Sequence, residues 1–92
     1  MPRILQTKRA AAQAAALPAE ERAELFRRLA GFGEALGNPH IHSGMGMRML
    51  EPGCMEIRVN LRTRAVLIRD GDDWILYLVG NHEDVRRFLK GR

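Results

Sequence analysis

The chain has 92 residues, and its hydrophobic share of 46% predicts one folded domain over residues 1–92 rather than a disordered chain. Fifteen lysines and arginines against eleven acidic residues give a formal net charge of +4, which favours nucleic acid or an acidic protein as partner. One cysteine excludes a disulfide within the chain and fits a reducing compartment. We expect a cytoplasmic protein with no membrane partner, because neither a secretory signal nor a long apolar span is present in the sequence.

The N-terminal part predicts a short strand followed by two helices. We expect an edge strand over residues 3–7. Residues 8–17 are rich in alanine, which favours a helix, and Pro18 interrupts that helix. A second helix is expected from Pro18 to about residue 36, where Gly37-Asn38-Pro39 ends it. Its apolar stripe, with spacings of three and four residues, consists of Leu25, Leu29, Phe32 and Leu36.

The C-terminal part predicts strands joined by tight turns, and then a last helix. Short apolar stretches bounded by glycine, proline, asparagine and aspartate are typical of strands. Asp70-Gly71-Asp72-Asp73 is a strong hairpin signal, and the apolar stretch 74–79 is expected near the centre of the sheet. After a glycine-rich loop over residues 40–46, the predicted strands cover 47–50, 54–60, 64–69 and 74–79, and the predicted helix covers 81–89.

The order of these elements predicts an α+β fold. Helices come first and hairpin-linked strands follow, which is typical of helices packed on one face of an antiparallel sheet. We therefore expect an N-terminal helical pair on an antiparallel sheet of about four strands, with a short C-terminal helix.

Arginines gather on two neighbouring predicted strands. Residues 58–69 contain no acidic residue and four arginines, which are Arg58, Arg62, Arg64 and Arg69. Alternation along the strand 54–60 places Glu56, Arg58 and Asn60 on the face opposite Met55, Ile57 and Val59. Because a guanidinium group binds phosphate through two parallel hydrogen bonds, RNA is the first partner to consider.

The three histidines are His40, His42 and His82. Histidine is the usual proton-transfer group near neutral pH, so His82 is a candidate for catalysis; alternatively it caps or hydrogen-bonds the last helix. We expect His40 and His42 to be solvated in their loop. The spacing of the three matches no standard metal motif, so we expect no metal and no other cofactor. Cys54 and Trp74 are expected to be buried core residues.

Several segments in the same order resemble the RelE/ParE superfamily of bacterial type II toxin–antitoxin toxins. The resemblance covers nearly the whole chain and is best over residues 37–89. It depends on Asn38-Pro39, Ser43-Gly44-Met45-Gly46-Met47-Arg48-Met49-Leu50, Met55-Glu56-Ile57-Arg58-Val59, Arg64-Ala65-Val66-Leu67-Ile68 and Val79-Gly80-Asn81-His82-Glu83-Asp84-Val85.

The resemblance implies a RelE-like fold and a function in translation control. RelE-branch toxins are metal-independent mRNA endoribonucleases that act on the ribosome and are neutralised by a cognate antitoxin, whereas ParE-branch toxins poison DNA gyrase. Carried over by position, the catalytic residues would be Arg58, Arg64 and His82. Arg48 lies near a basic position of the family at the loop edge and would contact RNA. Apart from the resemblance, we expect Arg62 and Arg69 to be RNA-binding through general phosphate contacts, or solvated charges, rather than catalytic groups.

Two departures from the family pattern keep alternatives open. Glu56 stands where a second basic strand residue is common, and the terminal tyrosine is absent, with Val85 and Phe88 in its neighbourhood. These departures favour a non-catalytic protein on the same fold, either a gyrase poison or an inactive relic. A generic RNA-binding α+β domain is the third alternative.

Overall fold

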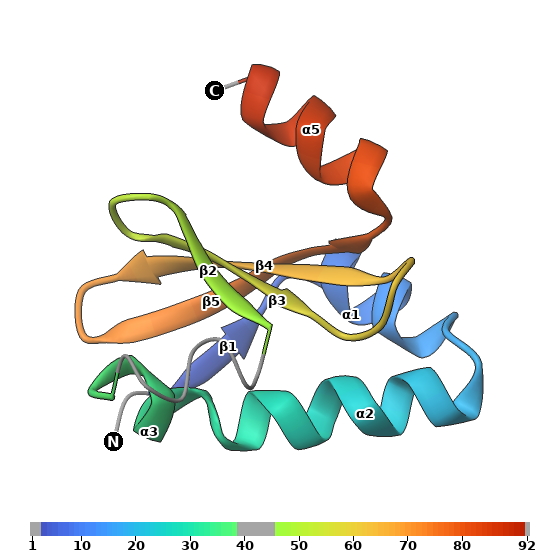
Figure 1. Ribbon diagram of the computed structural model, residues 1–92, viewed down its shortest axis with the longest axis horizontal. Helices are drawn as coiled ribbons and strands as arrows, with labels where there is room; N and C mark the ends of the chain where they lie inside the picture. The colour runs from blue at the N-terminus through green and yellow to red at the C-terminus, as the bar shows by residue number, and fades with distance from the viewer. Residues whose placement is uncertain (1–2, 39–45, 92) are drawn as a thin grey trace.

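The computed structural model describes residues 3–38 and 46–91. Their elements, in chain order, are β1 (Ile4–Gln6), α1 (Lys8–Ala15), α2 (Ala19–Ala30), α3 (Phe32–Leu36), β2 (Met47–Glu51), β3 (Cys54–Arg58), β4 (Arg64–Asp70), β5 (Asp73–Gly80) and α5 (His82–Lys90) (Figure 1). The α+β fold class is therefore confirmed. Within these ranges no helix is long and apolar enough to cross a membrane.

The described strands form one mixed sheet with the order β1-β5-β4-β3-β2. The predicted edge strand over residues 3–7 is confirmed as β1. The predicted antiparallel sheet of about four strands is corrected, because the described sheet has five strands and β1 pairs with β5 in parallel. The chain leaves β1 through the helices, re-enters the sheet at β2 on the opposite edge, and returns through antiparallel neighbours to β5, which runs parallel to β1. β4 holds the middle place, and β5 lies between β1 and β4.

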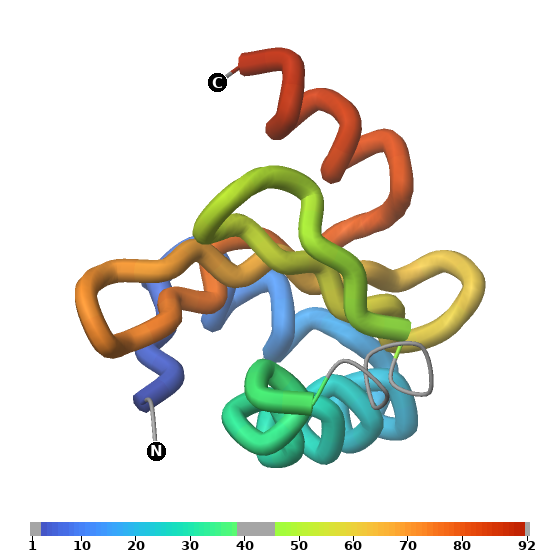
Figure 2. Tube along the Cα trace, turned by 60° about the vertical axis from the view of Figure 1, so that its left-hand side comes forward, coloured from blue at the N-terminus to red at the C-terminus, as the bar shows by residue number. Residues whose placement is uncertain are grey.

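The helices cover both faces of the sheet rather than one. In Figure 1, α2 and α3 lie below the sheet and α5 rises above it, and the turned view in Figure 2 agrees. The predicted helix up to residue 36 ends at Ala30 and resumes as α3. Gly31 has a low helix propensity, and its N–H donates to the carbonyls of both Arg28 and Leu29 at this break.

Two apolar clusters stabilise the sheet, one on each face. The larger lies between the sheet and α1–α3, where Phe32 meets Trp74 edge to face with ring centroids 5.2 Å apart. The smaller lies under α5 and contains Cys54, Val66, Leu78 and Val85. Trp74 and Cys54 are thus core residues, as predicted. Each fully buried aliphatic or aromatic side chain contributes about 1.5–3 kcal/mol through burial.

A carboxylate joins the first turn of α2 to the turn between β3 and β4. Asn60 Oδ1 accepts hydrogen bonds from the N–H groups of Arg62 and Thr63, each at 2.8 Å. Asn60 Nδ2 and Thr63 Oγ1 in turn donate to Glu21 Oε1. These hydrogen bonds, that from Asn60 first, lower the pKa of Glu21 below its ordinary value. The turn that precedes β4 is therefore anchored to the helical layer.

Candidate functional site

Three predicted arginines meet on the face of the sheet opposite α1–α3. Arg58 on β3 is the cross-strand partner of Arg64 on β4, and Arg48 on β2 is the partner of Glu56 on β3. Side chains on cross-strand partners project from the same face about 5 Å apart. A pocket of about 360 Å³, called here the arginine pocket, is lined by Gly46, Met47, Arg48, Glu56, Arg58 and Arg64.

Glu56 lies at the base of the arginine pocket between two guanidinium groups. Its Oε1 is 3.2 Å from Arg64 Nη1 and 3.4 Å from Arg48 Nη2. The Glu56 side chain is 2% exposed although it projects from the polar face of β3, because the arginines extend over it. The Glu56 carboxylate therefore holds Arg48 and Arg64 in place. Sequence reasoning missed this role, because the two arginines that hold Glu56 belong to the neighbouring strands β2 and β4.

Arg58 is placed by a close backbone contact with Gly46. The Arg58 N–H donates to the Gly46 carbonyl at 2.9 Å, which continues the pairing of β2 and β3. Gly46 has φ +64°, and a Cβ there would lie 3.0 Å from Arg58 Cβ and 3.2 Å from Arg58 O. Only glycine fits this position without displacing Arg58. The Arg58 side chain is exposed, and it forms no ion pair with any residue that the structure describes.

Two of the predicted RNA-contacting residues do not belong to this pocket. Arg69 is five residues along β4 from Arg64, so the two lie about 17 Å apart and project from opposite faces. Its Nε donates to the Gly71 carbonyl at 3.0 Å, at the other end of the sheet. Arg62 is exposed in the turn between β3 and β4, close enough to Glu21 for its charge to help lower the pKa of that carboxyl.

His82 is the first residue of α5, and its side chain is exposed. The alternative that His82 caps this helix is wrong, because Asn81 is the N-cap and forms a capping box with Asp84. Gly80, two residues before His82, pairs with Arg64, so His82 lies at the same end of the sheet as the arginine pocket without lining it. His40 and His42 lie outside the described residues.

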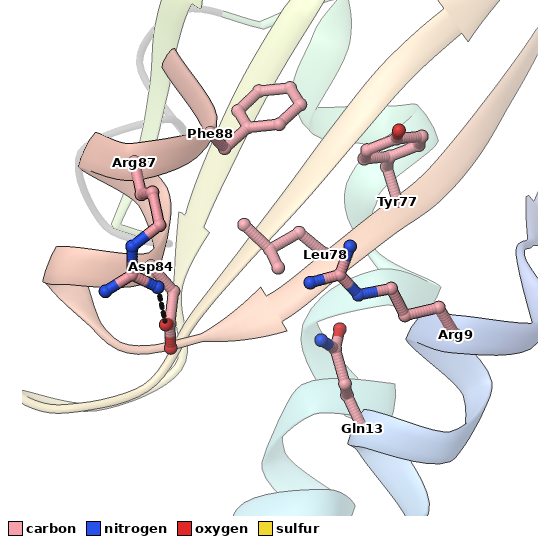
Figure 3. A pocket seen from close by; sticks show the side chains of 7 residues that line it. All are labelled: Arg9, Gln13, Tyr77, Leu78, Asp84, Arg87 and Phe88. Carbon is pink, nitrogen blue, oxygen red and sulfur yellow. Dashed lines mark hydrogen bonds and ion pairs between the residues drawn. The ribbon is translucent and has the colours of Figure 1, made fainter. Parts of the chain in front are cut away.

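A second hollow, of about 290 Å³, lies between α1, β5 and α5 (Figure 3). Tyr77 reaches it through a bulge in β5 and packs against Phe88 with ring centroids 5.5 Å apart. Arg9 and Gln13 line the hollow from one face of α1. Gln13 Oε1 accepts a hydrogen bond from the Val79 N–H at 2.9 Å. No residue is common to this hollow and the arginine pocket.

No side-chain group in residues 3–38 and 46–91 brings together three histidine, cysteine, aspartate or glutamate residues in a way that could hold a metal ion. The arginine pocket offers hydrogen bonding and charge, because three guanidinium groups and one carboxylate give it two net positive charges. Such a pocket suits an anion with several acceptor oxygens, such as a phosphate or a carboxylate.

Comparison with known proteins adds little to this geometry. No protein-family model and no curated protein matches the chain. Among solved structures, the solution structure of the conserved hypothetical protein HP0894 from Helicobacter pylori is similar at 17% sequence identity and a TM-score of 0.42, over 90% of this chain and 97% of that chain.

Proposed function

We propose that the protein is a RelE-like toxin: a metal-independent endoribonuclease that cuts mRNA on the ribosome, inhibits translation and is neutralised by a cognate antitoxin. The observation that carries the proposal is the arginine pocket, in which Arg48, Arg58 and Arg64 surround one buried carboxylate at an open end of the sheet. The resemblance of the sequence to RelE-branch toxins suggests the activity. The arginine pocket supports it, because its guanidinium groups can bind the phosphate that this activity requires.

Cleavage by this route is an attack of a ribose 2′-oxygen on the adjacent phosphorus. The new O–P bond forms as the bond from phosphorus to the 5′-oxygen breaks, which leaves a 2′,3′-cyclic phosphate and a 5′-hydroxyl. One proton leaves the 2′-hydroxyl and one is delivered to the departing 5′-oxygen. Because negative charge grows on the phosphate oxygens in the transition state, guanidinium groups already fixed around them are the main requirement.

The residues divide this work according to their surroundings. Arg58, which has no ion pair among the described residues, would bind the phosphate directly. Arg64, held by Glu56 and 18% exposed, would present its guanidinium with little loss of side-chain freedom on binding. His82, exposed at the same end of the sheet, would move the proton to the leaving oxygen.

A protein partner is supported by an apolar groove elsewhere on the surface. The groove, of about 330 Å³, runs beside the edge strand β1, where Leu5 and Phe26 are exposed. An edge strand beside apolar side chains is a common docking place for an extended segment. An antitoxin segment bound there would bury these side chains, and its continuation would cover the arginine pocket.

The non-catalytic alternative is favoured by one feature of the pocket. Glu56 forms ion pairs with two of the three arginines, Arg48 and Arg64. These ion pairs reduce the positive charge that is available to stabilise a transition state. Phe88, near the place of the absent tyrosine, packs on Tyr77 and lines the second hollow. On this alternative the protein acts by binding a protein target such as DNA gyrase, or is an inactive relic.

The test is to add the purified protein to a bacterial cell-free translation reaction. In a parallel sample, the protein is incubated with naked mRNA in the presence of EDTA and without ribosomes. The proposal predicts new mRNA 3′ ends with 2′,3′-cyclic phosphates at fixed codon positions during translation, and few cuts in naked mRNA. Intact mRNA with normal protein synthesis would contradict it. Inhibition of gyrase supercoiling in a separate reaction would then support the alternative.

A further inference from the structure

The second hollow combines apolar and charged side chains from three separate elements. Its apolar wall is formed by Tyr77 and Leu78 of β5 and by Phe88 of α5. Arg9 extends its guanidinium group into the hollow from α1 (Figure 3). Small-molecule sites begin at about 300 Å³ and have apolar walls with a few polar groups in fixed places. The hollow, of about 290 Å³, has the composition of such a site at its smallest size.

A bulge in β5 turns two consecutive side chains towards the second hollow. Leu76 and Leu78 pair with consecutive residues of β4, so Tyr77, which lies between them, is the additional residue. Neighbouring side chains on a regular strand project from opposite faces, whereas Tyr77 and Leu78 both line the hollow. Bulges commonly orient a side chain at a functional site. This bulge leaves the Tyr77 ring 42% exposed beside the buried Leu78.

Two hydrogen-bond donors in the second hollow are not used by the described part of the chain. Gln13 Oε1 accepts the Val79 N–H at 2.9 Å, and because an N–H group only donates, this bond turns the amide –NH₂ group of Gln13 away from β5. Among the described residues, neither this –NH₂ group nor the Arg9 guanidinium has a hydrogen-bond or ion-pair partner. Arg9 and Gln13 are four residues apart on α1, so both donors lie on one side of the hollow.

The acidic residue that lines the second hollow is already paired. Asp84 Oδ1 is 3.2 Å from Arg87 Nη1, and Asp84 Oδ2 accepts the Asn81 N–H at 2.8 Å. Arg9 therefore supplies one net positive charge to the hollow. A carboxylate matches this charge, and its two oxygens can accept from a guanidinium and an amide at once. A phosphate monoester carries nearly two negative charges and matches it less well.

We propose that the second hollow binds a small carboxylic acid with a planar apolar body, that is, an aryl-alkanoic acid. Its carboxylate binds the Arg9 guanidinium and the Gln13 amide, and its body lies against the rings of Tyr77 and Phe88. The second hollow shares no residue with the arginine pocket, so its ligand is independent of the proposed ribonuclease activity.

Indole-3-propionate and its uncharged amide, indole-3-propionamide, test the proposal by NMR titration of the full chain labelled with ¹⁵N. We expect the carboxylate to bind with a dissociation constant at or below about 1 mM, the range for a ligand of this size, and to shift the side-chain –NH₂ signals of Gln13. The amide should bind at least about ten times more weakly, the effect of one hydrogen bond to a charged group. Equal affinities, or no binding of either compound, would overturn the proposal.

Variants locate this preference on the named side chains. Arg9 is exposed, so Arg9→Gln should fold normally, bind indole-3-propionate about ten times more weakly and leave the affinity for the amide unchanged. Tyr77→Ala should weaken both compounds, because the aromatic wall contacts the body that they share. Arg27→Gln, on α2, is the matched control and should change neither affinity. A preference for the carboxylate that persists in Arg9→Gln would overturn the assignment.

A peptide that ends in tryptophan with a free carboxylate carries the same indole ring and acid, and it distinguishes a small-molecule ligand from a protein C-terminus. Binding of this peptide that is similar to that of indole-3-propionate, or weaker, would support the small-molecule site. Much tighter binding of the peptide, lost when its carboxylate is amidated, would assign the second hollow to a protein C-terminus and overturn the proposal.

Discussion

At the scale of single residues, Glu56 has the greatest influence on the candidate site. Its carboxylate is buried between Arg48 and Arg64, and it decides where both guanidinium groups lie. A buried ion pair contributes little compared with a well-packed apolar pair, but removing one member leaves the other charge uncompensated. Glu56 is therefore expected to matter for stability as well as for binding.

Glu56→Gln should lower the free energy of unfolding by about 1–3 kcal/mol, because Arg64 then lies largely buried without a counter-charge. The measurement is urea unfolding followed by circular dichroism. Glu83→Gln is the matched control, since Glu83 and Arg86 form an exposed pair whose loss should cost less than about 0.5 kcal/mol. Equal unfolding midpoints for the two variants would contradict the structural role of Glu56.

The carboxylate of Glu21 predicts a pH dependence of stability. Its pKa in the folded protein is lowered by hydrogen bonds from Asn60 and Thr63, so its contribution is complete above the unfolded value of about 4.3 and fades as the pH falls through the lower folded value. Glu21→Gln should lower the urea midpoint at pH 7, and the difference from the unsubstituted protein should shrink below about pH 4. Glu20→Gln, one residue away and exposed, should show no such difference at either pH. A Glu21→Gln deficit that is constant from pH 7 to pH 3 would contradict this origin.

At the scale of elements, the start of α5 is fixed by Asn81 and Asp84. Each side chain accepts the backbone N–H of the other at 2.8 Å, so two N–H groups that the helix leaves unpaired are satisfied. Gly80 permits this approach, because a Cβ there would lie 2.5 Å from Asp84 Oδ2. His82 follows directly, and its position relative to the arginine pocket depends on this cap.

Gly80→Ala should displace Asp84 and destabilise the protein by about 1–2 kcal/mol, the usual effect of losing a helix cap. Thermal unfolding measures the loss, and hydrogen exchange of the first α5 amides locates it. Gly37→Ala is the control, because a Cβ there meets only the Glu34 carbonyl at 3.9 Å. Unchanged exchange rates in α5 of Gly80→Ala would show that the capping box does not depend on this glycine.

The predicted elements lie within about two residues of the observed strands and of α1 and α5, because hydrophobic periodicity and turn residues are local signals. The direction of β1 could not be predicted, since it depends on how the helices cross the sheet. Arg58 and Arg64 were correctly placed on neighbouring strands. Arg69 was misplaced with them, although its odd spacing from Arg64 already indicated the opposite face. The burial of Glu56 depends on long side chains from two other strands, which no local pattern records.

At the scale of the whole molecule, the net charge is +4, and the arginines proposed to contact RNA do not all lie in one place. The arginine pocket occupies one end, and Arg69 lies at the other end on the face covered by α1–α3. Total charge steers any polyanion towards the protein, whereas only arginines in contact with phosphate release counterions on binding. Salt dependence therefore distinguishes the arginines that contact RNA from those that do not.

Arg58→Gln should reduce the slope of log affinity against log salt concentration by about 0.7, the value for one phosphate contact with a single strand. Arg69→Gln should leave the slope unchanged, because its side chain lies away from the arginine pocket. The measurement is anisotropy of one RNA oligonucleotide across a salt series. A loss of slope in Arg69→Gln equal to that in Arg58→Gln would place the RNA over both ends of the sheet.

The central claim is that the arginine pocket cuts mRNA during translation, and mapping mRNA 3′ ends in a cell-free translation reaction tests it most directly. The protein should produce cuts at fixed codon positions, Arg58→Ala/Arg64→Ala should abolish them while remaining folded, and Arg27→Ala should retain them. Cuts that persist in the folded double variant would place the chemistry elsewhere on the molecule. Intact mRNA with the unsubstituted protein would contradict the claim altogether.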